Sequence, residues 1–156
     1  MTHSRIVRSA PLAIEAPRAF VWNILTDLPR YHRWNTLSAR VESTLQLGEP
    51  VRLYISDTAI TGKTDVFEHR LLDFEPPEHI AWGYEQGEVR TRRDQYLGAT
   101  ADGCVYSTSD TFYGPLADPM MDAMGEAILR SFNTLAGSLR DYAERCYEGL
   151  RRKPDI

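Results

Sequence analysis

A long amphipathic stripe near the C-terminus constrains the fold of this chain more than any other feature. From Met121 to Cys146, apolar side chains recur at steps of three and four residues, the spacing of one face of an α-helix. Asp118 and Pro119 precede the stripe, and we expect the acid to cap the free N–H groups of a helix there. The spacing predicts a helix from about Pro119 to about Tyr147, roughly 40 Å long. The stripe consists of Met121, Met124, Ile128, Phe132, Leu135, Leu139, Tyr142 and Cys146.

The rest of the chain supplies the partner surface that such a helix needs. A strand is expected over 6–14, then a helix that Pro17 opens and Pro29 ends, then a second short helix over 30–34. Later residues alternate with a period of two, which predicts strands. Because sequential strands can pair directly, we expect one antiparallel sheet, curved around the helix, in an α+β fold. These strands are expected over 41–46, 51–56, 64–74, 79–84, 89–100 and 104–113.

Composition and charge exclude several classes of protein. With 156 residues and a formal net charge of −4, nothing draws the chain to nucleic acid or to an anionic membrane. No apolar run reaches the ~20 residues that span a bilayer, and the N-terminus lacks the continuous apolar core of a signal peptide. Cys104 and Cys146 are far apart and are expected to be reduced thiols. We therefore expect one cytoplasmic domain over 1–156, with 150–156 as a frayed tail.

No motif in the sequence demands a metal or a cofactor. There is no G-x-S-x-G, no phosphate-binding glycine loop and no H-E-x-x-H. Asp65 and His69 are four residues apart, but a strand separates residues at that spacing by about 13 Å. The remaining histidines, His3, His32 and His79, are not paired with another ligand type in a way that requires a metal. We expect the chain to hold neither a metal ion nor a cofactor.

Several local motifs, taken in order, resemble one known superfamily. They are IEAP at 14–17, VW at 21–22, LPRYHRWN at 28–35, LGE at 47–49, LDFEPPEHIAW at 72–82 and DGC at 102–104, followed by the amphipathic helix. They are similar to the START/Bet v 1-like superfamily, in particular its polyketide cyclase/dehydrase-like branch, although Thr36 stands where proline is common. The resemblance implies a helix-grip fold, in which a curved seven-stranded sheet wraps around the C-terminal helix and leaves a ligand cavity. Members include aromatase/cyclases, lipid carriers, hormone receptors and co-chaperones, so fold alone selects no activity.

Strand parity predicts which side chains line this cup. In the hairpin over 89–113, a turn at 101–103 without a bulge would place Arg93 opposite Thr108 and diagonal to Asp110, all facing inward. A one-residue bulge would instead turn Arg93 and Asp110 outward. Met120, Met121 and Met124 are either plain core or a flexible gate at the mouth of the cup. The expected ligand-binding residues are Trp82, Tyr84, Arg93, Gln95, Tyr106, Asp110, Met124, Ile128 and Phe132.

Three classes of function are consistent with these residues. The first is binding or carriage of a small hydrophobic molecule, because the predicted cup contains no nucleophile–base pair. The second is a polyketide cyclase/aromatase or a dehydratase, in which Arg93 polarises a carbonyl while Asp110 or Tyr106 moves a proton. The third is a co-chaperone-like protein-interaction module. The expected partner is a small hydrophobic ligand, with no nucleic acid and no integral membrane association, and the sequence leaves the oligomeric state open.

Overall fold

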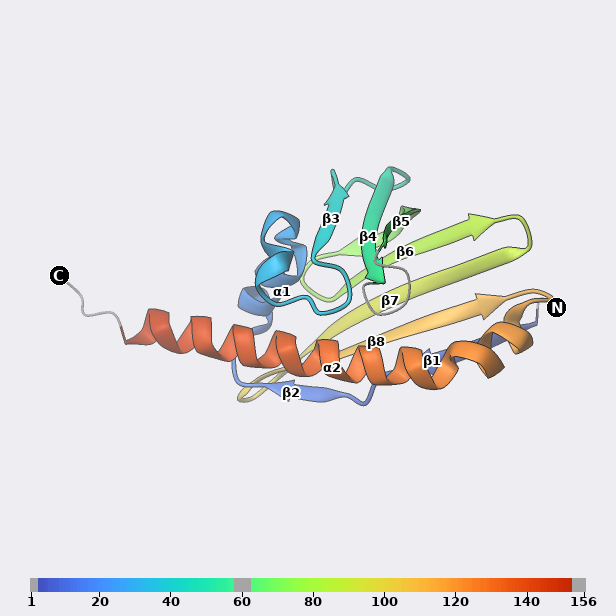
Figure 1. The fold of residues 1–156 in the computed structure, drawn as a ribbon. Coiled ribbons are helices and arrows are strands. Elements are labelled where there is room, and N and C mark those ends of the chain that lie inside the picture. Colours follow the sequence, from blue (N-terminus) through green and yellow to red (C-terminus); the bar gives the residue numbers. More distant parts are fainter. Residues whose placement is uncertain (1–2, 58–62, 153–156) are drawn as a thin grey trace.

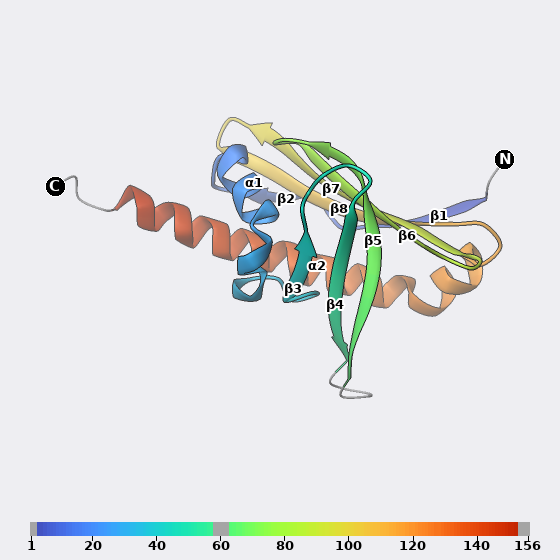
Figure 2. The ribbon, with the colours of Figure 1, turned by 90° about the horizontal axis from the view of Figure 1, so that it is seen from above.

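One curved antiparallel sheet and one long helix build the protein, as Figures 1 and 2 show. The computed structural model describes residues 3–57 and 63–152. The long helix α2, Ala117–Arg151, runs along the concave face of the sheet, and its C-terminal end projects beyond the sheet. This arrangement confirms the predicted α+β architecture of a sheet packed on a C-terminal helix.

Eight strands form the sheet, in the order β1-β8-β7-β6-β5-β4-β3, and β2 also pairs with β8. All strand pairs are antiparallel, as predicted. The strands are β1 Ser4–Arg8, β2 Leu12–Ile14, β3 Arg40–Ser43, β4 Pro50–Asp57, β5 Lys63–Glu75, β6 His79–Gln86, β7 Val89–Thr100 and β8 Gly103–Tyr113. The strand expected over 6–14 is therefore two strands. Ser9 separates them: its buried side chain accepts a hydrogen bond from the Thr108 N–H, and Pro11 has no N–H to continue the ladder.

Two other element boundaries differ from the prediction for local reasons. The strand expected over 41–46 ends at Ser43, because Leu45 adopts a φ of 56° in the left-handed region, which a strand cannot include. The two short helices are present as α1, Arg18–Thr26, and as the 3₁₀ helix η1, Leu28–Arg33. Both pack against the main core through buried apolar side chains.

The hairpin of β7 and β8 is paired two residues away from the expected register. Thr100 pairs with Gly103, so the turn contains only two residues, and Arg93 lies directly opposite Asp110. Thr108 lies opposite Gln95 instead. Because side chains alternate with a period of two, a shift of two residues preserves the face of every residue. Arg93 accordingly points toward α2, as predicted.

The helix α2 buries a narrower stripe than the sequence suggests. The prediction is correct for Phe132, Leu135 and Leu139, which are buried against the sheet, but wrong for Met124, which is 38% exposed. The expected N-terminal cap is also absent. Asp118 lies inside the first turn, where its carboxylate binds Arg5 on β1 and His3, so it does not cap the helix. The buried side of α2 instead passes through Ala117 and Gly125 before it reaches Phe132, Leu135 and Leu139.

Candidate functional site

Three residues on adjacent strands form a polar row across the concave face of the sheet. Trp82 on β6 is the cross-strand partner of Arg93 on β7, and Arg93 is the partner of Asp110 on β8. We call these three residues the concave row. Trp82 and Arg93 are only 2% and 7% exposed, so a potential cation and an indole N–H lie inside the protein. Buried groups of this kind require partners or a ligand.

The contacts of Arg93 leave part of its guanidinium without a partner. Its Nε donates to the Thr108 hydroxyl at 3.2 Å, and its Cζ lies 4.8 Å from the ring centroid of Phe132 on α2 and 5.8 Å from that of Trp82. Within 3–57 and 63–152, two fully buried side-chain nitrogens have no hydrogen-bond partner: Arg93 Nη2 and Trp82 Nε1. Both belong to the concave row, and both are donors.

The third member of the row, Asp110, is a half-buried acid that forms no ion pair with the arginine opposite. None of the described residues hydrogen-bonds to its carboxylate or lies within ion-pair distance of it. Burial raises the pKa of Asp110 to about 7, the Asp94 carboxylate also raises it, and the positive charge of Arg93 opposes both effects. The carboxyl group of Asp110 therefore titrates near pH 7, where an ordinary aspartate is already ionised.

The two tyrosine hydroxyls near the row are already engaged in hydrogen bonds. Tyr106 is fully buried and donates to Gln95 Oε1 at 2.6 Å, so these two predicted site residues bind each other. Tyr31, on η1, donates to the carbonyl of Leu25. Burial raises the pKa of both phenols. Neither hydroxyl is therefore positioned as a readily available acid.

A small aromatic group lies next to the row on β5 and β6. The half-buried ring of Tyr84 lies 5.2 Å from that of His69 and 5.8 Å from that of Phe67, measured between centroids. Burial lowers the pKa of His69 to about 4, so its imidazole is neutral at pH 7. From the sequence, His69 is considered only as a candidate metal ligand. Its parity with Leu71, which faces the core, was the signal that places it on the concave face.

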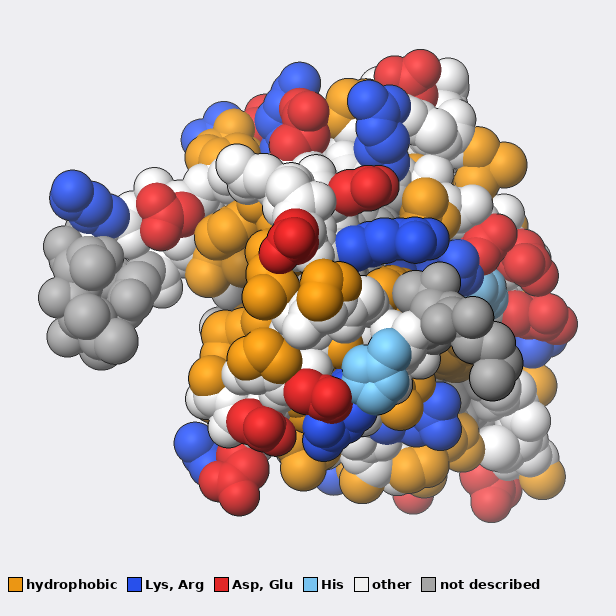
Figure 3. Space-filling view, turned by 90° about the vertical axis from the view of Figure 1, so that its right-hand side faces the viewer, with side chains coloured by type: hydrophobic (Ala, Val, Ile, Leu, Met, Phe, Trp, Pro, Cys, Tyr) orange, Lys and Arg blue, Asp and Glu red, His pale blue; other side chains and the backbone are white. Residues whose placement is uncertain are grey.

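The concave row lies at the border of two apolar clusters. The larger contains Trp82 and Tyr106 with α1 and the middle of α2. The smaller consists of Val7, Phe112, Ala117 and Phe132, with Leu37, Met120, Met121 and Ile128 partly buried against it. Among the predicted site residues, Ile128 and Phe132 belong to this smaller cluster, whereas Met124 lies on the surface. Figure 3 views this end of the molecule, where hydrophobic side chains are exposed between charged ones.

Residues 6–144 match the model of a family described as polyketide cyclase/dehydrase and lipid transport. The chain belongs to this family. A search of curated proteins finds no match. The prediction from the sequence motifs is thus confirmed at the level of the family.

Several solved structures have the same fold as this chain. The Zhui aromatase/cyclase from Streptomyces sp. R1128 has a TM-score of 0.69 and 18% identity over 92% of this chain and 95% of that one. Protein CV1439 from Chromobacterium violaceum has a TM-score of 0.70 and 17% identity over 89% and 97%. Ara h 8.0201 has a TM-score of 0.60 and 13% identity over 88% and 98%. At these identities the likeness shows the fold alone.

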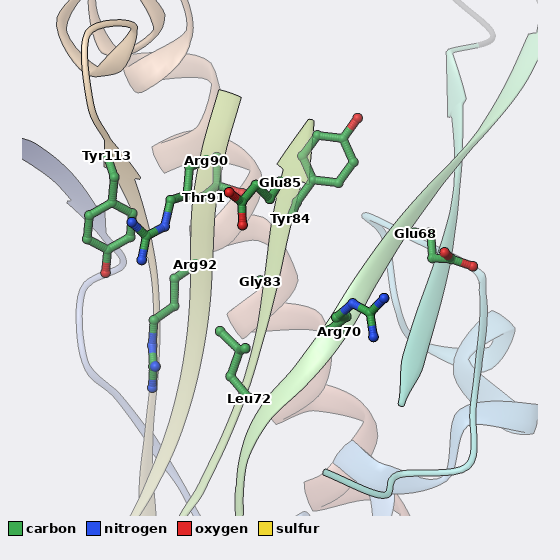
Figure 4. A pocket seen from close by; sticks show the side chains of 10 residues that line it. All are labelled: Glu68, Arg70, Leu72, Gly83, Tyr84, Glu85, Arg90, Thr91, Arg92 and Tyr113. Carbon is green, nitrogen blue, oxygen red and sulfur yellow. The ribbon is translucent and has the colours of Figure 1, made fainter. Parts of the chain in front are cut away.

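A separate hollow of about 370 Å³ lies on the outer face of the sheet (Figure 4). Its floor is Gly83, beside which Leu72 lies at a β-bulge in β5. The arginines around it have protein partners: Arg92 binds Asp73 and Asp94, Arg70 donates to the Gly48 carbonyl at 3.1 Å, and Arg90 stacks on Tyr113. The concave row, which keeps unpartnered donors, is therefore the stronger candidate site.

The structure adds three observations about metals, thiols and membranes. In the part of the chain that it describes, no three His, Cys, Asp or Glu side chains are placed to hold a metal ion. Cys104 and Cys146 are free thiols, the first buried and the second half-buried. No helix among the described residues is long and apolar enough to cross a bilayer.

Proposed function

We propose that this chain binds a small, largely apolar molecule between the concave face of the sheet and the N-terminal half of α2. The observation that carries the proposal is the pair of buried, unpartnered donors, Trp82 Nε1 and Arg93 Nη2. Buried donors are nearly always satisfied, and leaving one unsatisfied costs about 1–3 kcal/mol. An acceptor atom on a ligand, surrounded by the aromatic rings of Trp82 and Phe132, would supply the missing partner. Membership of a family of lipid transport proteins and polyketide cyclases supports the same function.

The smaller cluster provides the route by which such a molecule reaches the row. Its α2 side includes Met120 and Met121, which are only partly buried, and the next methionine, Met124, is exposed. Methionine side chains are flexible and adapt to irregular partners. We therefore assign the opening of the site to the partly buried methionines of the first turns of α2, Met120 and Met121.

A tryptophan at Ile128 is expected to weaken binding of an apolar probe without unfolding the protein. The folded wild type should bind the neutral dye Nile red with a rise and a blue shift of its fluorescence. Ile128→Trp fills space in the smaller cluster and should raise the dissociation constant about tenfold. Leu129→Trp, at the neighbouring exposed position of the same helical segment, is the matched control and should bind as the wild type does. Failure of the folded wild type to bind Nile red would contradict the proposal.

A second function, proton-transfer catalysis on a bound carbonyl compound, is favoured by Asp110. An acid whose pKa is about 7 can give or take a proton at neutral pH, and the adjacent guanidinium can stabilise negative charge on a carbonyl oxygen. Native mass spectrometry of the purified protein would identify a co-purifying ligand. Chemical change of that ligand by the wild type, abolished in Asp110→Asn, would establish catalysis. An unchanged ligand would leave binding as the function.

A further inference from the structure

We infer that the polar end of the bound molecule is a carboxylate, held by Trp82 and Arg93, and that its binding is coupled to uptake of one proton by Asp110. This inference rests on the proposed function and names the chemical class of the ligand. A neutral lipid or an alcohol would bind without that proton.

The geometry of the unpartnered atoms selects an acceptor. Trp82 and Arg93 are direct cross-strand partners, so Nε1 of one and Nη2 of the other belong to the same row on the same face. Neither atom can accept a hydrogen bond. A carboxylate presents two oxygens, and charge-assisted bonds from a guanidinium to a carboxylate are roughly twice as strong as neutral ones. The pair of donors therefore fits a carboxylate better than a hydroxyl, which offers a single oxygen.

The charge balance of the site selects an anion. Arg93 is 7% exposed and forms no ion pair with Asp110 across the strand. The nearby imidazole of His69 adds no charge, because burial lowers its pKa to about 4. Asp94 follows Arg93 on β7, but its carboxylate is bound by His79 at 2.7 Å and by Arg92 at 3.1 Å on the outer face. A ligand carboxylate would complete the pairing that the buried guanidinium lacks.

Asp110, which lies opposite Arg93, is the group that takes up the proton when the ligand binds. The charged groups that act on the Asp110 carboxyl are Arg93 and Asp94, both on β7. Its partner on β1, Val7, and the α2 residues of the smaller cluster, Ala117 and Phe132, are uncharged. A ligand carboxylate placed next to Asp110 repels its negative form, so Asp110 takes a proton from solvent and becomes neutral in the complex.

The sign of the pH dependence follows from this coupling. Below the free-state pKa of Asp110, about 7, the acid is already neutral and carboxylate affinity is at its maximum. Above that pH, binding requires uptake of a proton, so the affinity falls by up to tenfold for each further pH unit. The affinity for a neutral ligand shows no such fall.

Displacement of Nile red from the full chain by decanoate and by decanol tests the inference. Decanoate is ionised at both about pH 6 and about pH 8. We expect it to bind about tenfold more tightly than decanol at the lower pH and to lose most of that advantage at the higher pH. Decanol affinity should be equal at both. Asp110→Asn should keep the decanoate advantage at both pH values, because the amide is permanently neutral.

Two donor variants locate the carboxylate, and the outcomes separate the inference from the proposed function. Arg93→Gln and the milder Trp82→Phe, which removes one N–H, should each lower decanoate affinity by a larger factor than decanol affinity, because the carboxylate makes the stronger, charge-assisted bonds. If decanoate and decanol displace the dye equally at both pH values, the carboxylate inference is overturned and ligand binding stands. If decanoate keeps its advantage at the higher pH in the wild type, the proton coupling is overturned. If Nile red, decanoate and decanol all fail to bind, the proposed function falls as well.

Discussion

Replacing Leu139 by aspartate is expected to unfold the protein at neutral pH. Leu139 lies on the buried face of α2, has no exposed surface and belongs to the larger apolar cluster. An unpaired carboxylate there loses its hydration, and the site also loses the packing of the leucine. The combined cost is about 5 kcal/mol or more, which equals the whole stability of many domains. Urea denaturation followed by circular dichroism should show no cooperative transition.

The same substitution at an exposed position of the helix is the control. Leu129 lies on α2 ten residues earlier in the numbering, and its side chain is 37% exposed. Leu129→Asp should shift the unfolding free energy by less than about 1 kcal/mol, because the carboxylate remains hydrated. Equal denaturation midpoints for the two variants would show that α2 does not pack on the sheet through this face.

The two leucines also show how far periodicity predicts the packing of α2. Steps of three and four identify the buried face correctly at Phe132, Leu135 and Leu139. The same steps extend to Met124, which is exposed, because its neighbour Gly125 is the residue that α2 buries at this level. Met124 and Gly125 both fit steps of three and four between Met121 and Ile128, so the spacing alone does not choose between them.

The sequence predicts which face of the sheet carries the candidate site, but it does not predict which contacts the side chains of the site form. Parity places Arg93 and Asp110 on the concave face even though the expected pairing was wrong by two residues. The same error assigned the wrong neighbour, since Asp110 and not Thr108 lies opposite Arg93. Whether two facing side chains form a bond depends on rotamers and on surrounding volume. The free donors of the concave row could therefore only be found from the structure.

The pH dependence of stability is expected to reveal the half-buried acid of this row, Asp110. The pKa of Asp110 is raised from its ordinary value of 3.8 to about 7 in the folded protein. Between these values the folded state holds a proton that the unfolded state releases, so the stabilising effect of that proton is complete below about pH 4 and is lost as the pH rises through 7. At pH 8 the ionised form costs up to about 4 kcal/mol.

Asp110→Asn removes this cost, because the amide has the same shape and never ionises. We expect the variant to be more stable than the wild type by a few kcal/mol at pH 8, with the difference shrinking toward zero at pH 4. Asp118→Asn is the matched control. The Asp118 carboxylate is exposed, and Arg5 and His3 lower its pKa, so its amide variant should gain no stability at pH 8. The measurement is the urea midpoint of each protein from pH 4 to pH 8. Parallel curves for Asp110→Asn and the wild type would contradict the prediction, because they would mean that Asp110 has the same pKa in the folded protein as in the unfolded chain.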